Sequence, residues 1–116
     1  MTQSEHYQRS LELRENLRII ADNLSAAIVA LQEHYPDFQI TTTSSIHDSH
    51  GLYIRIMCVV HSTPFHDAMD IYVEEDYITL KDVKYSLSDP QVLSKVVEGF
   101  RIEILARFEK HKSCKY

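Results

Sequence analysis

Apolar residues in the first 35 positions recur every three or four residues, the spacing that places side chains on one face of a helix. This stripe consists of Leu13, Leu17, Ala21, Leu24, Ile28, Leu31 and Tyr35. No Gly or Pro occurs before Pro36, and Thr2 with Glu5 has the spacing of a capping box. The pattern therefore predicts one long helix that begins at Thr2 and ends at Tyr35.

The N-terminal half of this predicted helix is more polar than its C-terminal half. Its apolar residues are Tyr7, Leu11, Leu13 and Leu17. A helix of this length is about 48 Å long, whereas the later strand-like segments are about 30 Å long. We therefore expect residues 1–16 to project past the sheet as a helical arm. Tyr7 and Leu11 either lie on a solvated arm or bind a partner or a second copy of the chain.

After Pro36, apolar and polar residues alternate, which is typical of β-strands. The pattern predicts four strands, at positions 38–46, 52–60, 68–73 and 77–83. The connections between them are short, so consecutive strands are expected to pair as an antiparallel meander. Leu87, Ser88, Gln91 and Val92 then have the spacing of a hydrophobic staple around a capping box, which predicts the start of a second helix.

The predicted order is one long helix, a four-stranded antiparallel meander and a C-terminal helix. This α-β-β-β-β-α order over residues 1–116 indicates a single domain of the α+β class, built as a two-layer sandwich. The simplest arrangement puts both helices on one face of the sheet. The alternative is one helix on each face, and the sequence leaves that choice open.

With both helices on one face, the opposite face of the sheet has no helix to cover it. The second strand contributes Tyr53, Arg55, Met57, Val59 and His61 to this face. This series is unusually apolar for a face exposed to water, and an uncovered apolar patch marks an interface. We therefore predict that Tyr53, Met57 and Val59 bind a partner, most simply a second copy that stacks sheet on sheet to form a homodimer.

The charge distribution restricts the possible partners. The net charge of -5 argues against general binding of nucleic acid, which requires a basic surface. Glu74, Glu75 and Asp76 form an acidic segment that either binds a basic partner or protects a strand edge from aggregation. Positive charge collects at the end of the second helix. A nucleic-acid-associated dimer that uses this basic helix is therefore the first alternative function.

The seven histidines raise the question of a metal site. Four of them form two pairs at opposite ends of the second strand, His47 with His50 and His61 with His66. The end that holds His61 and His66 also receives Asp67 and His34, which together offer nitrogen and oxygen ligands for zinc. No HExxH or CxxC motif accompanies them. We predict no metal, and keep a metal- or ligand-binding domain at this end as the second alternative.

Catalytic and cofactor motifs are missing from the sequence. Ser49 and Cys58 have no visible orienting partner, and Gly51 and Gly99 are too few for a phosphate-binding loop. We therefore predict neither an enzyme nor a cofactor. Cys58 and Cys114 do not make a disulfide framework, no signal peptide opens the chain, and no apolar stretch reaches the length of a membrane span. These features predict a cytoplasmic protein.

The leading interpretation is a small cytosolic protein-interaction module, such as an adaptor, an inhibitor or a regulatory subunit. It is expected to bind another protein or a second copy of itself through the arm, the uncovered sheet face and the acidic segment.

Overall fold

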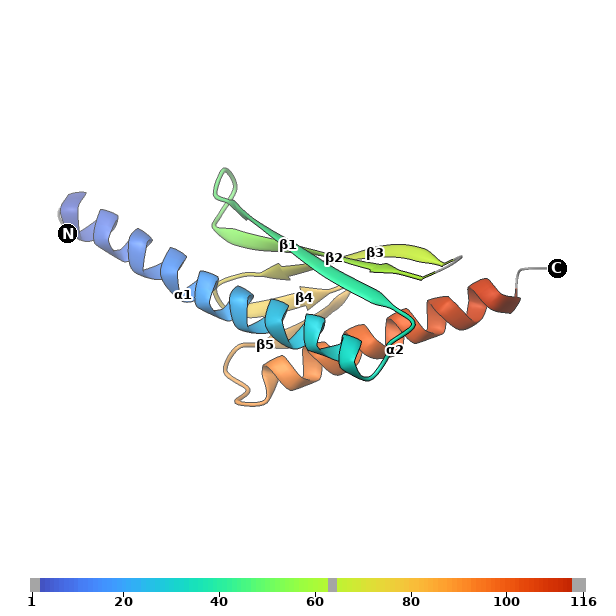
Figure 1. Ribbon diagram of the computed structural model, residues 1–116. Helices are drawn as coiled ribbons and strands as arrows, with labels where there is room; N and C mark the ends of the chain where they lie inside the picture. Colours follow the sequence, from blue (N-terminus) through green and yellow to red (C-terminus); the bar gives the residue numbers. More distant parts are fainter. Residues whose placement is uncertain (1–2, 63–64, 114–116) are drawn as a thin grey trace.

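The computed structural model describes residues 3–62 and 65–113, with side chains from Gln8 to Lys112. The predicted cap at Thr2 and the tail cysteine Cys114 lie outside this part of the chain. The elements are α1 (Gln3–Ala30), a 3₁₀ turn η1 (Leu31–Glu33), β1 (Gln39–His47), β2 (Tyr53–His61), β3 (His66–Val73), β4 (Tyr77–Leu80), β5 (Val83–Ser86) and α2 (Val92–Ser113) (Figure 1). The α+β class and the helix–sheet–helix order are confirmed.

Helix α1 forms because its apolar residues follow the helical period. Leu17, Ala21, Leu24 and Ile28 are buried with 0–1% exposure, and they form one stripe toward the sheet. The α-helical part ends at Ala30, earlier than the predicted end at Tyr35, and the chain tightens into η1. A 3₁₀ turn is common at a helix end, and Pro36 disfavours helical geometry in the residue before it.

The five strands form one sheet in the order β1-β2-β3-β4-β5, each antiparallel to the next. Alternation along β2 follows the predicted period of two. Its residues Ile54, Ile56, Cys58 and Val60 are buried, whereas the residues between them are half-buried or exposed. One face of the sheet therefore belongs to the core and the other does not.

The predicted strand at 77–83 is wrong, because this segment and the residues after it form two strands. β4 and β5 are joined by a tight turn in which Leu80 pairs with Val83. Lys81 adopts a φ of 55°, and this left-handed conformation reverses the chain within the two-residue turn. Turns of this kind favour Gly or Asn, and neither residue is present here, so no hairpin signal marks this turn.

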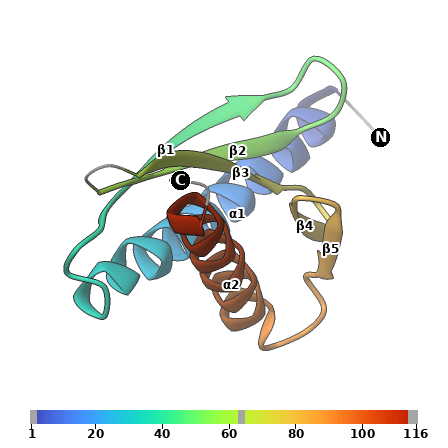
Figure 2. The ribbon, with the colours of Figure 1, turned by 90° about the vertical axis from the view of Figure 1, so that its right-hand side faces the viewer.

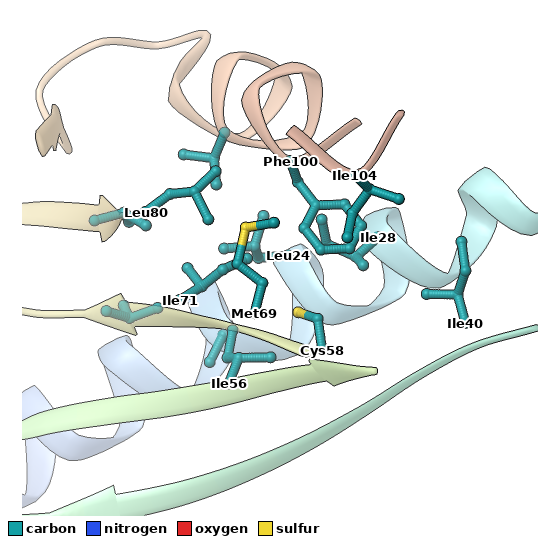
Figure 3. Packing of buried hydrophobic residues seen from close by; sticks show 14 of the residues in the cluster. Leu24, Ile28, Ile40, Ile56, Cys58, Met69, Ile71, Leu80, Phe100 and Ile104 are labelled. Carbon is teal, nitrogen blue, oxygen red and sulfur yellow. The ribbon is translucent and has the colours of Figure 1, made fainter. Parts of the chain in front are cut away.

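Both helices cover the same face of the sheet, which is the simpler of the two arrangements that the sequence leaves open (Figure 2). α1 packs under β1, β2 and β3, and α2 packs against β4, β5 and α1. Figure 3 shows Phe100 and Ile104 of α2 meeting Leu24 and Ile28 of α1 above the sheet residue Met69. A cavity of about 10 Å³ among these layers has room for no more than about one water molecule.

The ends of the two helices extend past opposite ends of the sheet (Figure 1). The molecule is therefore elongated, with extents of 63 × 27 × 24 Å. The start of α2 is capped by Asp89, whose Oδ1 accepts a 2.9 Å hydrogen bond from the Gln91 amide, whereas the Ser88 hydroxyl contacts Ser86. Asp89 followed by Pro90 has the order of an N-cap and first helical residue.

Candidate functional site

The sheet face opposite the helices carries most of the predicted site, and we call it the open face. It is formed by alternate residues of the strands: Tyr53, Arg55, Met57 and Val59 of β2, Asp70 and Tyr72 of β3, Tyr77 of β4 and Lys84 of β5, with His47 at the end of β1. The register places Arg55 between Ser45 and Tyr72, and Met57 between Thr43 and Asp70. These residues therefore form one continuous surface.

An ion pair occupies the centre of the open face. Arg55 Nη2 donates a 3.0 Å hydrogen bond to Asp70 Oδ2, and the Tyr72 hydroxyl lies 3.5 Å from the same oxygen. The hydrogen bond with Asp70 raises the pKa of Arg55 above its ordinary value, and the negative charge of Asp70 adds to this effect. Because each charge is matched by its neighbour, the centre of the face is close to neutral.

Aromatic rings extend across the open face from its β1 corner. The rings of His47 and Tyr53 are stacked, with centroids 4.9 Å apart and an interplanar angle of 12°. Tyr53 meets Tyr72 edge to face at 5.9 Å, and the Lys84 ammonium lies 4.4 Å from the centroid of the Tyr77 ring. These contacts hold the rings in place before any partner binds, which reduces the entropy lost on binding.

Apolar surface continues along β2 beside the ion pair. Met57 is 37% exposed, and Val59 is half-buried between Thr41 and Ala68. Tyr, Met and Arg are the residue types that protein interfaces favour over the rest of the surface. The predicted residues Tyr53, Met57 and Val59 therefore lie together, and the structure adds Tyr72 and Tyr77 to them. The alternation of apolar and polar residues in β3 and β4 is the sequence pattern that could have placed these two tyrosines on the open face.

The other predicted binding residues lie elsewhere. Leu11 is 42% exposed on α1, and the side chain of Tyr7 lies outside the described residues. Glu74, Glu75 and Asp76 form the β3–β4 turn, where Glu74 is half-buried and the other two are exposed. Glu75 lines shallow grooves beside α1, together with Leu13. The structure thus separates the predicted residues into three places.

The histidine end of the sheet is organised by α2. The rings of His61 and His66 lie 5.5 Å apart, and Asp67 forms a 3.1 Å ion pair with Arg107. His111 also reaches this end, where its ring lies 5.6 Å from Phe65. Among the described residues, no group of three or more His, Cys, Asp or Glu side chains is placed to hold a metal ion. No local pattern in the sequence indicates the contributions of α2, because only the fold brings this helix to these strands.

The cations of α2 are largely matched by carboxylates of the chain. The ion pairs are Lys95 with Asp89, Arg101 with Glu98, Arg107 with Asp67 and Glu103, and Lys112 with Glu109. The hydrogen bonds from Lys81 and Arg107 lower the pKa of Glu103, so this carboxylate is ionised at neutral pH. A helix whose cations already have anionic partners has less positive charge to offer a phosphate backbone.

Cys58 lies on the helix side of β2 and is buried. Burial raises the pKa of its thiol to about 12, and the negative charge of Asp70 acts in the same direction. The thiolate is the reactive form of cysteine, so this side chain behaves as a small apolar residue of the core.

No protein-family model, curated protein or solved structure matches this chain. Neither α1 nor α2, over the residues that the structure describes, has an apolar run sufficient for a bilayer crossing. The surface chemistry of the described residues is therefore the basis for a functional proposal.

Proposed function

We propose that this chain is a cytosolic protein-interaction module, acting as an adaptor, an inhibitor or a regulatory subunit, and that it binds its partner through the open face. One observation carries this proposal. Met57 is 37% exposed, half-buried Tyr53 and Val59 lie on the same side of its strand, and half-buried Tyr72 lies on the neighbouring strand, all on a sheet face that neither helix covers. Burial of an apolar, aromatic surface of this kind against a partner removes it from water, which contributes a favourable free energy to binding.

The chemistry of the open face favours a protein over a nucleic acid. Nucleic-acid affinity depends mainly on cations that neutralise phosphates. The central cation of this face, Arg55, already donates to Asp70, and the chain carries a net charge of -5. The partner that fits best presents a flat apolar surface with polar groups at its rim. A second copy stacked sheet on sheet would present Met57 and Val59 beside its own ion pair of Arg55 and Asp70, and it is one candidate partner; another protein is the other.

Substitution of Met57 tests the proposal. Met57→Asp places a charge on the apolar part of the open face beside the ion pair, and Ile102→Asp is the matched control because Ile102 is 56% exposed on α2. Each tagged variant is used for affinity capture from the source cells, with thermal melts to verify that both fold. We expect wild type and Ile102→Asp to retain the same protein partner or second copy, and Met57→Asp to lose at least about tenfold in affinity, or about 1.4 kcal/mol.

Two results would contradict the proposal. One is retention of every wild-type partner by Met57→Asp. The other is capture of material that nuclease treatment removes, with loss of binding when the cations of α2 are replaced, because this pattern would favour the nucleic-acid alternative.

A further inference from the structure

The outer edge of β1 is the second surface that could join this chain to another. Within the part of the chain that the structure describes, β1 pairs only with β2, so its other side faces away from the sheet. In an antiparallel ladder, the backbone groups of alternate residues point to opposite sides of the strand. The Ile40 amide donates a 2.9 Å hydrogen bond to Gln32 Oε1, outside the sheet. The backbone amide of Ile40 therefore points away from β2, and so do the backbone groups of Thr42, Ser44 and Ile46. The outward backbone groups of these three residues have no partner among the described residues.

The β1 edge also lacks the features that usually prevent strands from pairing. Its nine residues include no Pro, Lys, Arg, Asp or Glu, and its register with β2 runs without a bulge from Gln39 to His47. The opposite edge of the sheet differs. β5 has only four residues, and one of them is Lys84. Short length and charge protect an edge, so β5 is protected and β1 is not.

Exposed apolar side chains border this edge on its helix side. Leu11 and Val29 are 42% and 38% exposed, and they lie on the same side of α1 because eighteen residues make about five turns. Arg14 and Gln32, each three residues further along, contact the β1–β2 turn and β1 itself. Ile46, at the end of β1, is 45% exposed. An occupant of the edge would thus cover apolar surface as well as bond to the backbone.

We infer that the occupant is a second copy of this chain, whose β1 pairs antiparallel with this β1 across a two-fold axis. An uncharged strand can meet its own copy without contact between like charges, which a charged edge strand cannot do. Because the Ile40 amide already donates its hydrogen bond to Gln32, the pairing between the two copies begins at Thr42. Thr42 then lies opposite Ile46 of the second copy, and Ser44 lies opposite its own equivalent.

This pairing joins two five-stranded sheets into one continuous sheet and places the two open faces side by side. Leu11 and Val29 of the two copies lie along the junction beneath it. The inference does not depend on the proposed function of the open face, because it uses the backbone edge and the flank of α1.

Disulfide trapping tests the register. In residue pairs that exchange two backbone hydrogen bonds, Cα atoms are about 5.5 Å apart, which is within the range of a disulfide. Ser44→Cys is made in a Cys114→Ser background, and mild oxidation is expected to convert most of it into a covalent dimer. Gln39→Cys is the control, because this exposed position at the end of the same strand has no equivalent residue near it in the proposed dimer. Equal yields from both variants, or no covalent dimer from Ser44→Cys, would overturn the inference.

Light scattering at tens of micromolar gives an independent readout. We expect wild type to be dimeric. Ser44→Lys should raise the dissociation constant of the dimer at least tenfold, because two lysines would face each other across the axis. Gln39→Lys should remain dimeric. A monomeric wild type would overturn the inference. This holds also if the β1 edge of that monomer binds an extended peptide of another protein. A dimer that Met57→Asp dissociates and Ser44→Lys leaves intact would show stacking through the open face, which rejects edge pairing and retains the proposed function.

Discussion

The side-chain carbonyl of Gln32 accepts a 2.9 Å hydrogen bond from the backbone amide of Ile40, and this contact joins the end of the first helix to the first strand. It explains how the chain turns after η1, because an amide at the sheet edge needs a partner and Gln32 supplies one. It also leaves the outward groups of β1 from Thr42 onward available to a second chain.

Removal of this contact is expected to weaken the fold modestly. Gln32→Ala leaves the Ile40 amide without its side-chain acceptor, and we expect a loss of about 1 kcal/mol in the free energy of unfolding. Glu33→Ala, at an exposed neighbouring position, should change the free energy by less than about 0.5 kcal/mol. Urea denaturation measures both values. Equal losses in the two variants would show that the Gln32 contact does not stabilise the strand.

Gly99 and Tyr85 should be energetically coupled. A Cβ atom at Gly99 would lie 2.5 Å from the Tyr85 hydroxyl oxygen, so Gly99→Ala forces that ring to move. Ala is otherwise favoured over Gly within a helix by about 1 kcal/mol. We expect the change in the free energy of unfolding caused by Gly99→Ala to be at least about 1 kcal/mol more favourable in a Tyr85→Phe background, where the hydroxyl is missing. Thermal or urea unfolding of the four proteins measures the coupling, and additive effects would contradict it.

The ion pairs of Glu103 predict a specific pH dependence. Hydrogen bonds from Lys81 and Arg107 lower the pKa of this carboxyl in the folded state, so its contribution to stability is complete above the unfolded pKa of about 4.3. This contribution is lost as the pH falls through the lower folded value. Glu103→Gln should therefore reduce stability by up to about 1 kcal/mol at pH 7, and the difference from wild type should disappear at acidic pH. A difference that is constant from pH 7 to pH 2 would contradict this assignment.

The contribution of Cys58 to stability should depend on pH in the opposite sense. The folded state keeps the thiol protonated up to a pKa of about 12, whereas the unfolded thiol ionises near pH 8.5. The unfolded state therefore binds fewer protons between these values, and the stability difference between wild type and Cys58→Ala should shrink as the pH rises. In a Cys114→Ser background, a thiol reagent should modify Cys58 only after unfolding. Rapid modification of the folded protein would show that the thiol is accessible.

Much of this fold is predictable from periodicity alone. The stripe through Leu17, Leu24 and Ile28 marks the buried face of α1, and the alternation in β2 separates Ile56 from Met57. These patterns are reliable because burial repeats every few residues along an element. They also locate Tyr53, Met57 and Val59 on the face away from the helices.

Features that depend on single backbone conformations or on distant contacts are harder to predict. The turn at Lys81 has no Gly or Asn to signal it, so one predicted strand proved to be two. Asp89, and not Ser88, caps α2, because the choice between two adjacent polar residues depends on local geometry. The contact of Arg107 with Asp67 joins residues far apart in the sequence, and no local pattern indicates it.

Site-specific photo-cross-linking at Tyr53 tests most directly whether the open face is the binding surface. A photoreactive phenylalanine analogue is placed at Tyr53, and for comparison at Ile102 on α2, and each protein is irradiated in the source cells. We expect a defined protein adduct, with another polypeptide or with a second copy, from position 53 and not from position 102. Adducts from position 102 alone, or none from position 53, would contradict the proposal that this chain binds proteins through the open face.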